Sequence, residues 1–160
     1  MLFRSDFPKI PGVAVATRPM QPYDLDFSAE PPALGEPYAK LLPRVDPDGN
    51  EPDGIRLPSI QVPLATYTGW NLRSPEIGAP DEMYSLVGSY IPFARTKAER
   101  EKKGDPRRSI EERYTSRQEY LRKVEAAARN LAGTGFLLEQ DIPKLVERGA
   151  AEWDWTARPR

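Results

Sequence analysis

A cluster of aromatic and polar side chains at residues 66–71 is the best candidate surface for a ligand in this sequence. Tyr67, Trp70 and Asn71 lie there together with two threonines. Aromatic rings with a few polar groups line many small-molecule pockets. Both rings can equally serve in packing with their polar ends hydrogen-bonded, and the residue types alone favour this second interpretation. The three residues are therefore candidates for a substrate pocket and not catalytic groups.

Histidine and cysteine, which act as base and nucleophile in many hydrolases, are both absent from the 160 residues. A Ser-His-Asp triad, a Cys-His pair and a histidine metal site are therefore impossible within this chain. Ser89 follows Gly88, but the Gly-x-Ser-x-Gly pattern of a nucleophile elbow is missing. We therefore assign no catalytic residue, no metal site and no cofactor.

Acidic residues occur in pairs, but their positions favour structural roles. Asp81-Glu82 lies in a predicted loop and Glu111-Glu112 at a predicted helix start, where carboxylates complement the helix dipole. The acidic run over residues 45–51 lacks the alternating ligands and the closing glutamate of a calcium loop. It predicts a turn in which Gly49 adopts a positive φ.

Proline is concentrated in the first part of the chain, with 15 of the 18 prolines in residues 1–92. Because proline lacks an N–H group and fixes φ, this part cannot be built from long helices or central strands. Residues 6–53 are predicted to be irregular and to form a proline-rich extended arm. Apolar residues within it, among them Phe27, Tyr38 and Leu41-Leu42, favour an arm that lies on a larger body over a solvated linker.

Residues 54–160 are predicted to form an α+β segment with one or two short strands and three C-terminal helices. Residues with high β propensity favour strands over 59–67, interrupted by Pro63, and over 84–91. Two Ser/Thr-x-x-Glu capping boxes, which begin at Thr96 and Ser109, predict helix starts. The helices are predicted over residues 97–103, 110–131 and 139–150.

Charge is distributed unevenly along the chain. Residues 1–93 hold 7 Lys/Arg and 12 Asp/Glu, whereas residues 94–160 hold 16 Lys/Arg and 12 Asp/Glu. The basic tail alternates with glutamates at helical spacing, as on a solvated helix face, so we expect no nucleic-acid partner. No apolar run approaches the length of about 20 residues that spans a bilayer, so no membrane partner is expected either.

Two stretches carry a resemblance to a known family. Residues 54–73 contain Gly-Ile-Arg-Leu-Pro and Val-Pro-Leu-Ala-Thr-Tyr-Thr-Gly-Trp-Asn. Residues 86–115 contain Gly-Ser-Tyr-Ile-Pro-Phe, Thr-Lys-Ala-Glu-Arg and Gly-Asp-Pro-Arg. These residues resemble the C-terminal region of a bacterial family of alpha/beta hydrolase domain proteins.

The resemblance implies an α/β parent fold and a serine-hydrolase-like activity on ester or related acyl substrates. The nucleophile elbow and the histidine of such a protein would lie upstream of the matched region, so no catalytic residue is transferred to a position here. The resemblance implies a C-terminal segment that completes a hydrolase body and lends Tyr67, Trp70 or Asn71 to its pocket wall. Its partners would be the upstream remainder of its own domain and a small-molecule substrate.

The start of the chain suggests a truncated gene. Residues 1–5, Met-Leu-Phe-Arg-Ser, resemble a translated sequencing-adapter end, and we interpret them as an artefactual start. The segment alone is then expected to be inactive. A non-catalytic protein-interaction module with a basic helical tail is the alternative, and a reading frame that continues upstream of Met1 would distinguish the two.

Overall fold

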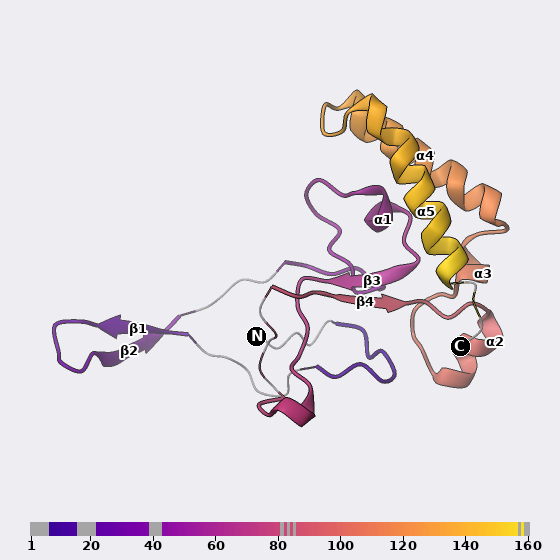
Figure 1. Cartoon of the computed structure of the whole chain (residues 1–160). Helices are drawn as coiled ribbons and strands as arrows, with labels where there is room; N and C mark the ends of the chain where they lie inside the picture. The colour runs from indigo at the N-terminus through magenta and orange to yellow at the C-terminus, as the bar shows by residue number, and fades with distance from the viewer. Residues whose placement is uncertain are drawn as a thin grey trace.

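The computed structural model describes residues 7–15, 22–38, 43–80, 82, 84, 86–156 and 158. Within these residues the fold is α+β, with five α-helices and two antiparallel sheets of two strands each (Figure 1). The helices are α1 (Pro58–Gln61), α2 (Lys97–Lys103), α3 (Ile110–Arg113), α4 (Arg117–Gly133) and α5 (Ile142–Thr156). The strands are β1 (Tyr23–Asp26), β2 (Ala33–Pro37), β3 (Ala65–Thr68) and β4 (Ser89–Pro92). Short 3-10 helices cover Pro75–Ile77 and Glu139–Asp141.

Some of the predictions concern residues outside this described part, namely residues 1–5 and Leu41-Leu42 in the arm. The division of the chain at residue 53 stays a prediction. No helix of the described residues is both long enough and apolar enough to cross a membrane.

Residues 54–160 contain two strands, β3 and β4, but the expectation of an irregular segment before them is wrong, because β1 and β2 form a hairpin there. Apolar Tyr23 and Leu25 alternate with Asp24 and Asp26, which is the period of a strand. The prolines nearby do not interrupt this pattern, since Pro37 is the last residue of β2.

Strands β3 and β4 pair over four residues, from Ala65 opposite Pro92 to Thr68 opposite Ser89. The strand predicted over 59–67 is wrong at its start, where Pro58 occupies the first turn of α1. The strand predicted over 84–91 is shorter and ends one residue later, because β4 covers Ser89–Pro92. Gly88 precedes β4 in close contact with β3. A Cβ atom on Gly88 would lie 2.2 Å from the carbonyl oxygen of Thr68.

The predicted helix over 97–103 is confirmed as α2. The helix predicted over 110–131 is interrupted: α3 ends at Arg113, Tyr114 is extended, and Ser116 caps a new helix, α4. The last helix extends beyond residue 150 to Thr156, and Pro143 lies in its first turn, as predicted. Residues 97–156 thus contain four α-helices rather than three, and α1 is a further helix that was not predicted.

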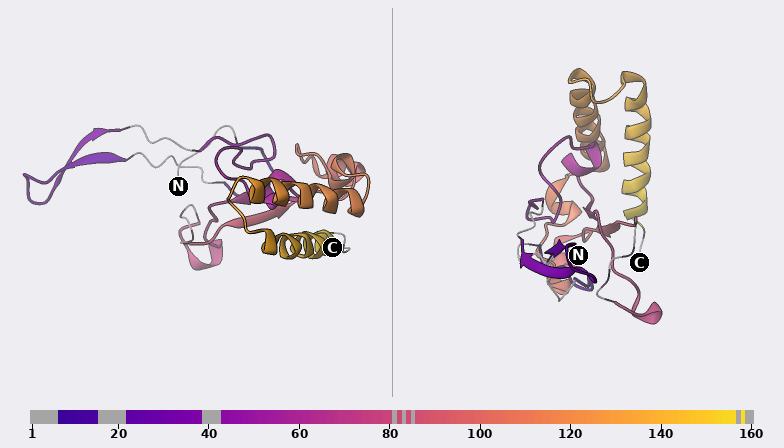
Figure 2. Two further views of the ribbon diagram at one scale, coloured as in Figure 1. Left: turned by 90° about the horizontal axis from the view of Figure 1, so that it is seen from above. Right: turned by 90° about the vertical axis from the view of Figure 1, so that its left-hand side faces the viewer.

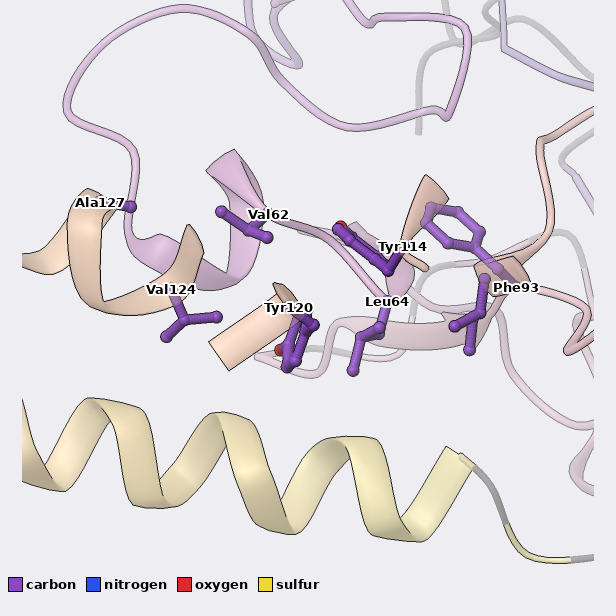
Figure 3. Packing of buried hydrophobic residues seen from close by; sticks show 8 residues of the cluster. Val62, Leu64, Phe93, Tyr114, Tyr120, Val124 and Ala127 are labelled. Carbon is purple, nitrogen blue, oxygen red and sulfur yellow. The ribbon is translucent and has the colours of Figure 1, made fainter. Parts of the chain in front are cut away.

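The core lies where α4 and α5 pack side by side against the β3–β4 sheet and the short helices α1 and α3 (Figures 1 and 2). Its buried residues are Val62, Leu64, Phe93, Ile110, Tyr114, Tyr120, Val124 and Ala127, most of which are seen in Figure 3. The Tyr114 and Tyr120 rings meet edge to face with centroids 5.1 Å apart. The Tyr114 hydroxyl donates to the carbonyl of Pro63 at 2.9 Å, so this buried polar atom is satisfied.

The capping box of α3 makes one carboxylate strongly acidic. The Glu112 carboxylate accepts from the backbone N–H of Ser109 at 2.8 Å and from its hydroxyl at 2.7 Å. These hydrogen bonds, followed by the charge of Arg100, lower the pKa of Glu112 to about 2. The bonds are made by the ionised form, so they stabilise the folded state only while the carboxylate is charged.

We expect the capping box to contribute to acid unfolding. The folded pKa lies below the ordinary value of 4.5, so its contribution is complete above about pH 4.5 and is lost as the pH falls toward 2. Glu112→Gln should flatten the dependence of the denaturant midpoint on pH in this window. Glu147→Gln, at an exposed position of α5, is the control and should leave the profile unchanged. An unchanged slope in the Glu112 variant would contradict the assignment.

Candidate functional site

The two faces of β3 have different chemistry, because successive side chains of a strand point to opposite sides. Thr66 is fully buried and accepts a hydrogen bond from Arg107. Tyr67 points to the other side, where its hydroxyl donates to the carboxylate of Glu152 on α5. The candidate site is therefore built around one short strand that is held from both sides.

Arg107 is the central buried charge of the first face and is only 3% exposed. A guanidinium has five N–H donors, and all five are used here. Nε donates to Asp105 Oδ1 at 3.0 Å, and Nη2 donates to Asp105 Oδ2 at 2.7 Å. Nη1 donates to Thr66 Oγ1 and to the Ile91 carbonyl, each at 2.9 Å. Nη2 also donates to the Pro92 carbonyl at 3.2 Å. Arg107 thus joins both strands of the sheet to the turn that follows α2.

Asp105 supplies the charge that makes the burial of Arg107 possible. Burial acts to raise the pKa of Asp105, but the hydrogen bonds and the charge of Arg107 outweigh it and hold the pKa below its usual value. The carboxylate is therefore ionised at neutral pH and forms a paired charge with Arg107. A carboxylate in this state is not available as a general acid.

A second arginine extends this ionic cluster. The Arg113 guanidinium carbon lies 4.1 Å from the centroid of the Phe93 ring, and that of Arg107 lies 5.1 Å from it. These are distances at which the ring face attracts a cation. Arg113 also binds both oxygens of Asp48, which ties the turn before α1 to α3.

Asn50 fixes the same turn to β3 from within the core, where it is fully buried. Its side-chain amide donates to the carbonyl of Ala65 at 3.1 Å and accepts from the backbone N–H of Tyr67 at 2.8 Å. Gly49 has the predicted positive φ, +81°. The acidic run is thus a structural turn, in agreement with its prediction.

Tyr67 lies in an aromatic row on the second face of the sheet. Its ring meets that of Tyr90, its partner across the strands, at 5.3 Å, and Tyr90 meets Trp155 of α5 at 5.3 Å. Burial, followed by the hydrogen bond to Glu152 and its charge, raises the pKa of Tyr67 far above its ordinary value. The phenol therefore stays protonated and can serve as a hydrogen-bond donor but not as a base.

Trp70 and Asn71 lie beyond the end of β3 and have other neighbours. The Trp70 ring meets Phe7 edge to face at 5.4 Å, and its carbonyl accepts from the Ser89 hydroxyl at 3.0 Å. Asn71 Oδ1 accepts from the backbone N–H of Leu72 at 2.9 Å. Tyr67 thus packs toward α5 and Trp70 toward the N-terminal segment, and the role of these residues in a substrate pocket stays a prediction.

A cleft of about 360 Å³ lies beside Arg107, between the end of β4, α2 and the C-terminal end of α5. Six charged side chains line it: Arg95, Glu99, Lys103, Asp105, Arg107 and Arg158. The hydrogen bond from Lys103, and then that from the backbone of Arg95, lowers the pKa of Glu99. With four cations against two carboxylates, the cleft is positive at neutral pH and can bind an anionic group.

The described residues include no group of three or more acidic side chains placed to hold a metal ion. Ser89 donates to a backbone carbonyl, which is a structural role and leaves it without a base.

Arg107 and Glu152 were not singled out by the sequence analysis. Arg107 enters there only as the last residue of the Gly-Asp-Pro-Arg motif of the family resemblance, and Glu152 lies beyond the end of the last predicted helix. Arg107 contacts Thr66, which is 41 residues away in the sequence, and Glu152 contacts Tyr67, which is 85 residues away. A local signal exists for the Asp105–Arg107 pair, because the acid lies two residues before the arginine in the short stretch between two predicted helices.

Comparison of the sequence with known protein families identifies one match. The sequence profile of the family described as Alpha/beta hydrolase domain matches residues 10–147. The chain belongs to this alpha/beta hydrolase domain family. The matched range includes the hairpin, the β3–β4 sheet, the Arg107 cluster, all of α4 and the start of α5 up to residue 147. No curated protein and no solved structure matches the chain.

We expect the Arg107 cluster to dominate the stability of this alpha/beta hydrolase domain segment. Arg107→Lys keeps the charge but leaves at least two of the five acceptor contacts unmade, and should cost about 3 kcal/mol of unfolding free energy. Arg129→Lys, in an exposed pair with Glu125, should cost less than about 0.5 kcal/mol. Denaturant unfolding of both variants measures the difference, and equal losses would contradict the role given to Arg107.

Proposed function

We propose that this chain is the C-terminal structural segment of a serine-hydrolase-like protein that acts on ester or related acyl substrates. One observation carries the proposal: residues 10–147 match the alpha/beta hydrolase domain profile, yet the sequence has no histidine and no cysteine. A serine hydrolase needs a base to activate its nucleophile. The nucleophile and the histidine would therefore come from an upstream part of the same domain.

In this proposal the segment contributes binding and not proton transfer. The protonated Tyr67 phenol already donates its single O–H to Glu152, so Tyr67 offers a ligand its ring, and Trp70 offers a half-buried aromatic surface. The positive cleft beside Arg107 could hold a carboxylate of the substrate or of the upstream segment. Substrate class rests on the family alone, because one fold supports many chemistries.

The test compares the 160-residue chain with the product of the longest reading frame that continues upstream of Met1. We expect hydrolysis of short p-nitrophenyl esters by the longer protein only, and its loss when the elbow serine is changed to alanine. Ester hydrolysis by the 160-residue chain alone would contradict the proposal. Absence of activity in the longer protein would favour the alternative, a non-catalytic interaction module.

The pocket role of the aromatic residues is tested in the active longer protein. Trp70→Ala should lower kcat/KM roughly tenfold if the ring lines the substrate pocket, since about 1.4 kcal/mol of binding is lost. Phe136→Ala is the matched control, because that ring is exposed in the loop between α4 and α5. Unchanged kinetics in a folded Trp70 variant would assign the ring to packing against Phe7.

A further inference from the structure

The β1–β2 hairpin has an apolar face that nothing in the described chain covers. Tyr23 and Leu25 lie on one side of β1, and Leu34 of β2 is directly opposite Leu25, so it shares that side. All nine residues of the two strands are exposed, Leu34 to 72%. Phe27, in the turn that follows β1, is 75% exposed.

Figures 1 and 2 show the hairpin standing apart from the helices and from the second sheet. An isolated hairpin of two strands is marginally stable in water, and contiguous exposed apolar side chains mark interaction sites. The residue range that matches the family profile spans this hairpin. A partner surface is therefore needed to cover its apolar face.

The charge of the hairpin specifies the chemistry of that partner. Residues 22–38 contain four acids, Asp24, Asp26, Glu30 and Glu36, and no lysine or arginine. A partner surface should then combine an apolar floor with a basic rim, because opposite charges at the edge of an interface guide docking and exclude wrong partners.

A groove with this combination lies between α1 and α4 of the same chain and has a volume of about 510 Å³. Val62, Pro63 and Tyr114 supply apolar surface, together with two alanines of α4. Its charged lining consists of Arg108, Arg113 and Lys123, without a carboxylate. Arg113 is paired with Asp48 and Lys123 with Glu119, whereas Arg108 donates to the backbone carbonyl of Glu112 and has no carboxylate partner among the ion pairs of the described residues.

We propose that the hairpin of one copy docks into the groove between α1 and α4 of a second copy, in a two-fold dimer with exchanged arms. The hairpin points away from α1 and α4 of its own copy (Figures 1 and 2), so a second copy supplies the groove. Two-fold symmetry makes the contact twice, which doubles the apolar area that each association buries. This inference does not depend on the proposed hydrolase function.

Sedimentation equilibrium of the 160-residue chain over a concentration series is the first measurement. We expect a species of twice the 18.0 kDa chain mass. Leu25→Asp combined with Leu34→Asp should weaken dimerisation at least tenfold, because both charges would enter the groove. Leu138→Asp changes an equally exposed leucine outside the hairpin and should leave the dimer intact.

Charge reversal identifies the two surfaces as partners of each other. One variant carries Asp24→Lys, Glu30→Lys and Glu36→Lys, which makes the hairpin positive and leaves the Asp26–Ser28 hydrogen bonds of the turn in place. The other carries Arg108→Glu and Lys123→Glu. Each alone should be monomeric, since its hairpin and groove then have the same sign, whereas an equimolar mixture should form a heterodimer with both contacts complementary.

Circular dichroism checks that all four variants are folded. A monomeric wild-type chain at every concentration would overturn the proposal and would assign the hairpin to another partner, such as an upstream part of a longer polypeptide. A dimer that survives the Leu25 and Leu34 changes would place the interface on a different surface. Failure of the mixed charge variants to associate would overturn the pairing of hairpin with groove.

Discussion

The structure depends on the burial of one guanidinium, that of Arg107. A buried cation is destabilising unless it is paired and its donors are all satisfied. Here Asp105 neutralises it, and the remaining donors bind Thr66 and two carbonyls of β4. The position of the β3–β4 sheet relative to α2 and α3 is therefore fixed by direction-dependent hydrogen bonds, and not by apolar packing alone.

The second face of the sheet is held by weaker but more extensive contacts. Tyr67, Tyr90 and Trp155 form a row of edge-to-face rings, and Glu152 anchors the first of them to α5. Helix α5 thus reaches the sheet through aromatic surface on one side, whereas the arginine cluster holds the other. A chain of this size with an abundance of proline gains rigidity from such contacts where regular secondary structure is sparse.

Local signals in the sequence were sufficient to predict the helices whose ends are set by capping residues. Thr96 and Gly104 determine α2, and Ser109 with Glu112 determines the start of α3. The break at Tyr114 was missed because the apolar period continues through it: the Tyr114 side chain stays in the core although its backbone is extended. Periodicity reports which side chains are buried, and it does not report whether the backbone between them is helical.

Contacts between distant residues could not be predicted from one sequence. The pairs Asp48–Arg113 and Tyr67–Glu152 are each formed by residues whose types are common on any surface. Only the tertiary fold makes them partners: the sequence places Asp48 in a predicted turn and Tyr67 in a candidate pocket or packing cluster, and it marks neither Arg113 nor Glu152. The β1–β2 hairpin is different, because the alternation of apolar and acidic residues in β1 is visible in the sequence. The density of prolines around it led to the wrong expectation of an irregular segment.

Gly88 determines how the second sheet tolerates change. Its missing side chain lets the backbone approach the Thr68 carbonyl, at 2.2 Å from the place where a Cβ would be. Even alanine would force the strands apart or shift their pairing by a residue. Because a shift of one residue turns every side chain of a strand to the other side, Tyr90 would exchange places with Ile91. A substitution at Gly88 would therefore disrupt the aromatic row of Tyr67, Tyr90 and Trp155.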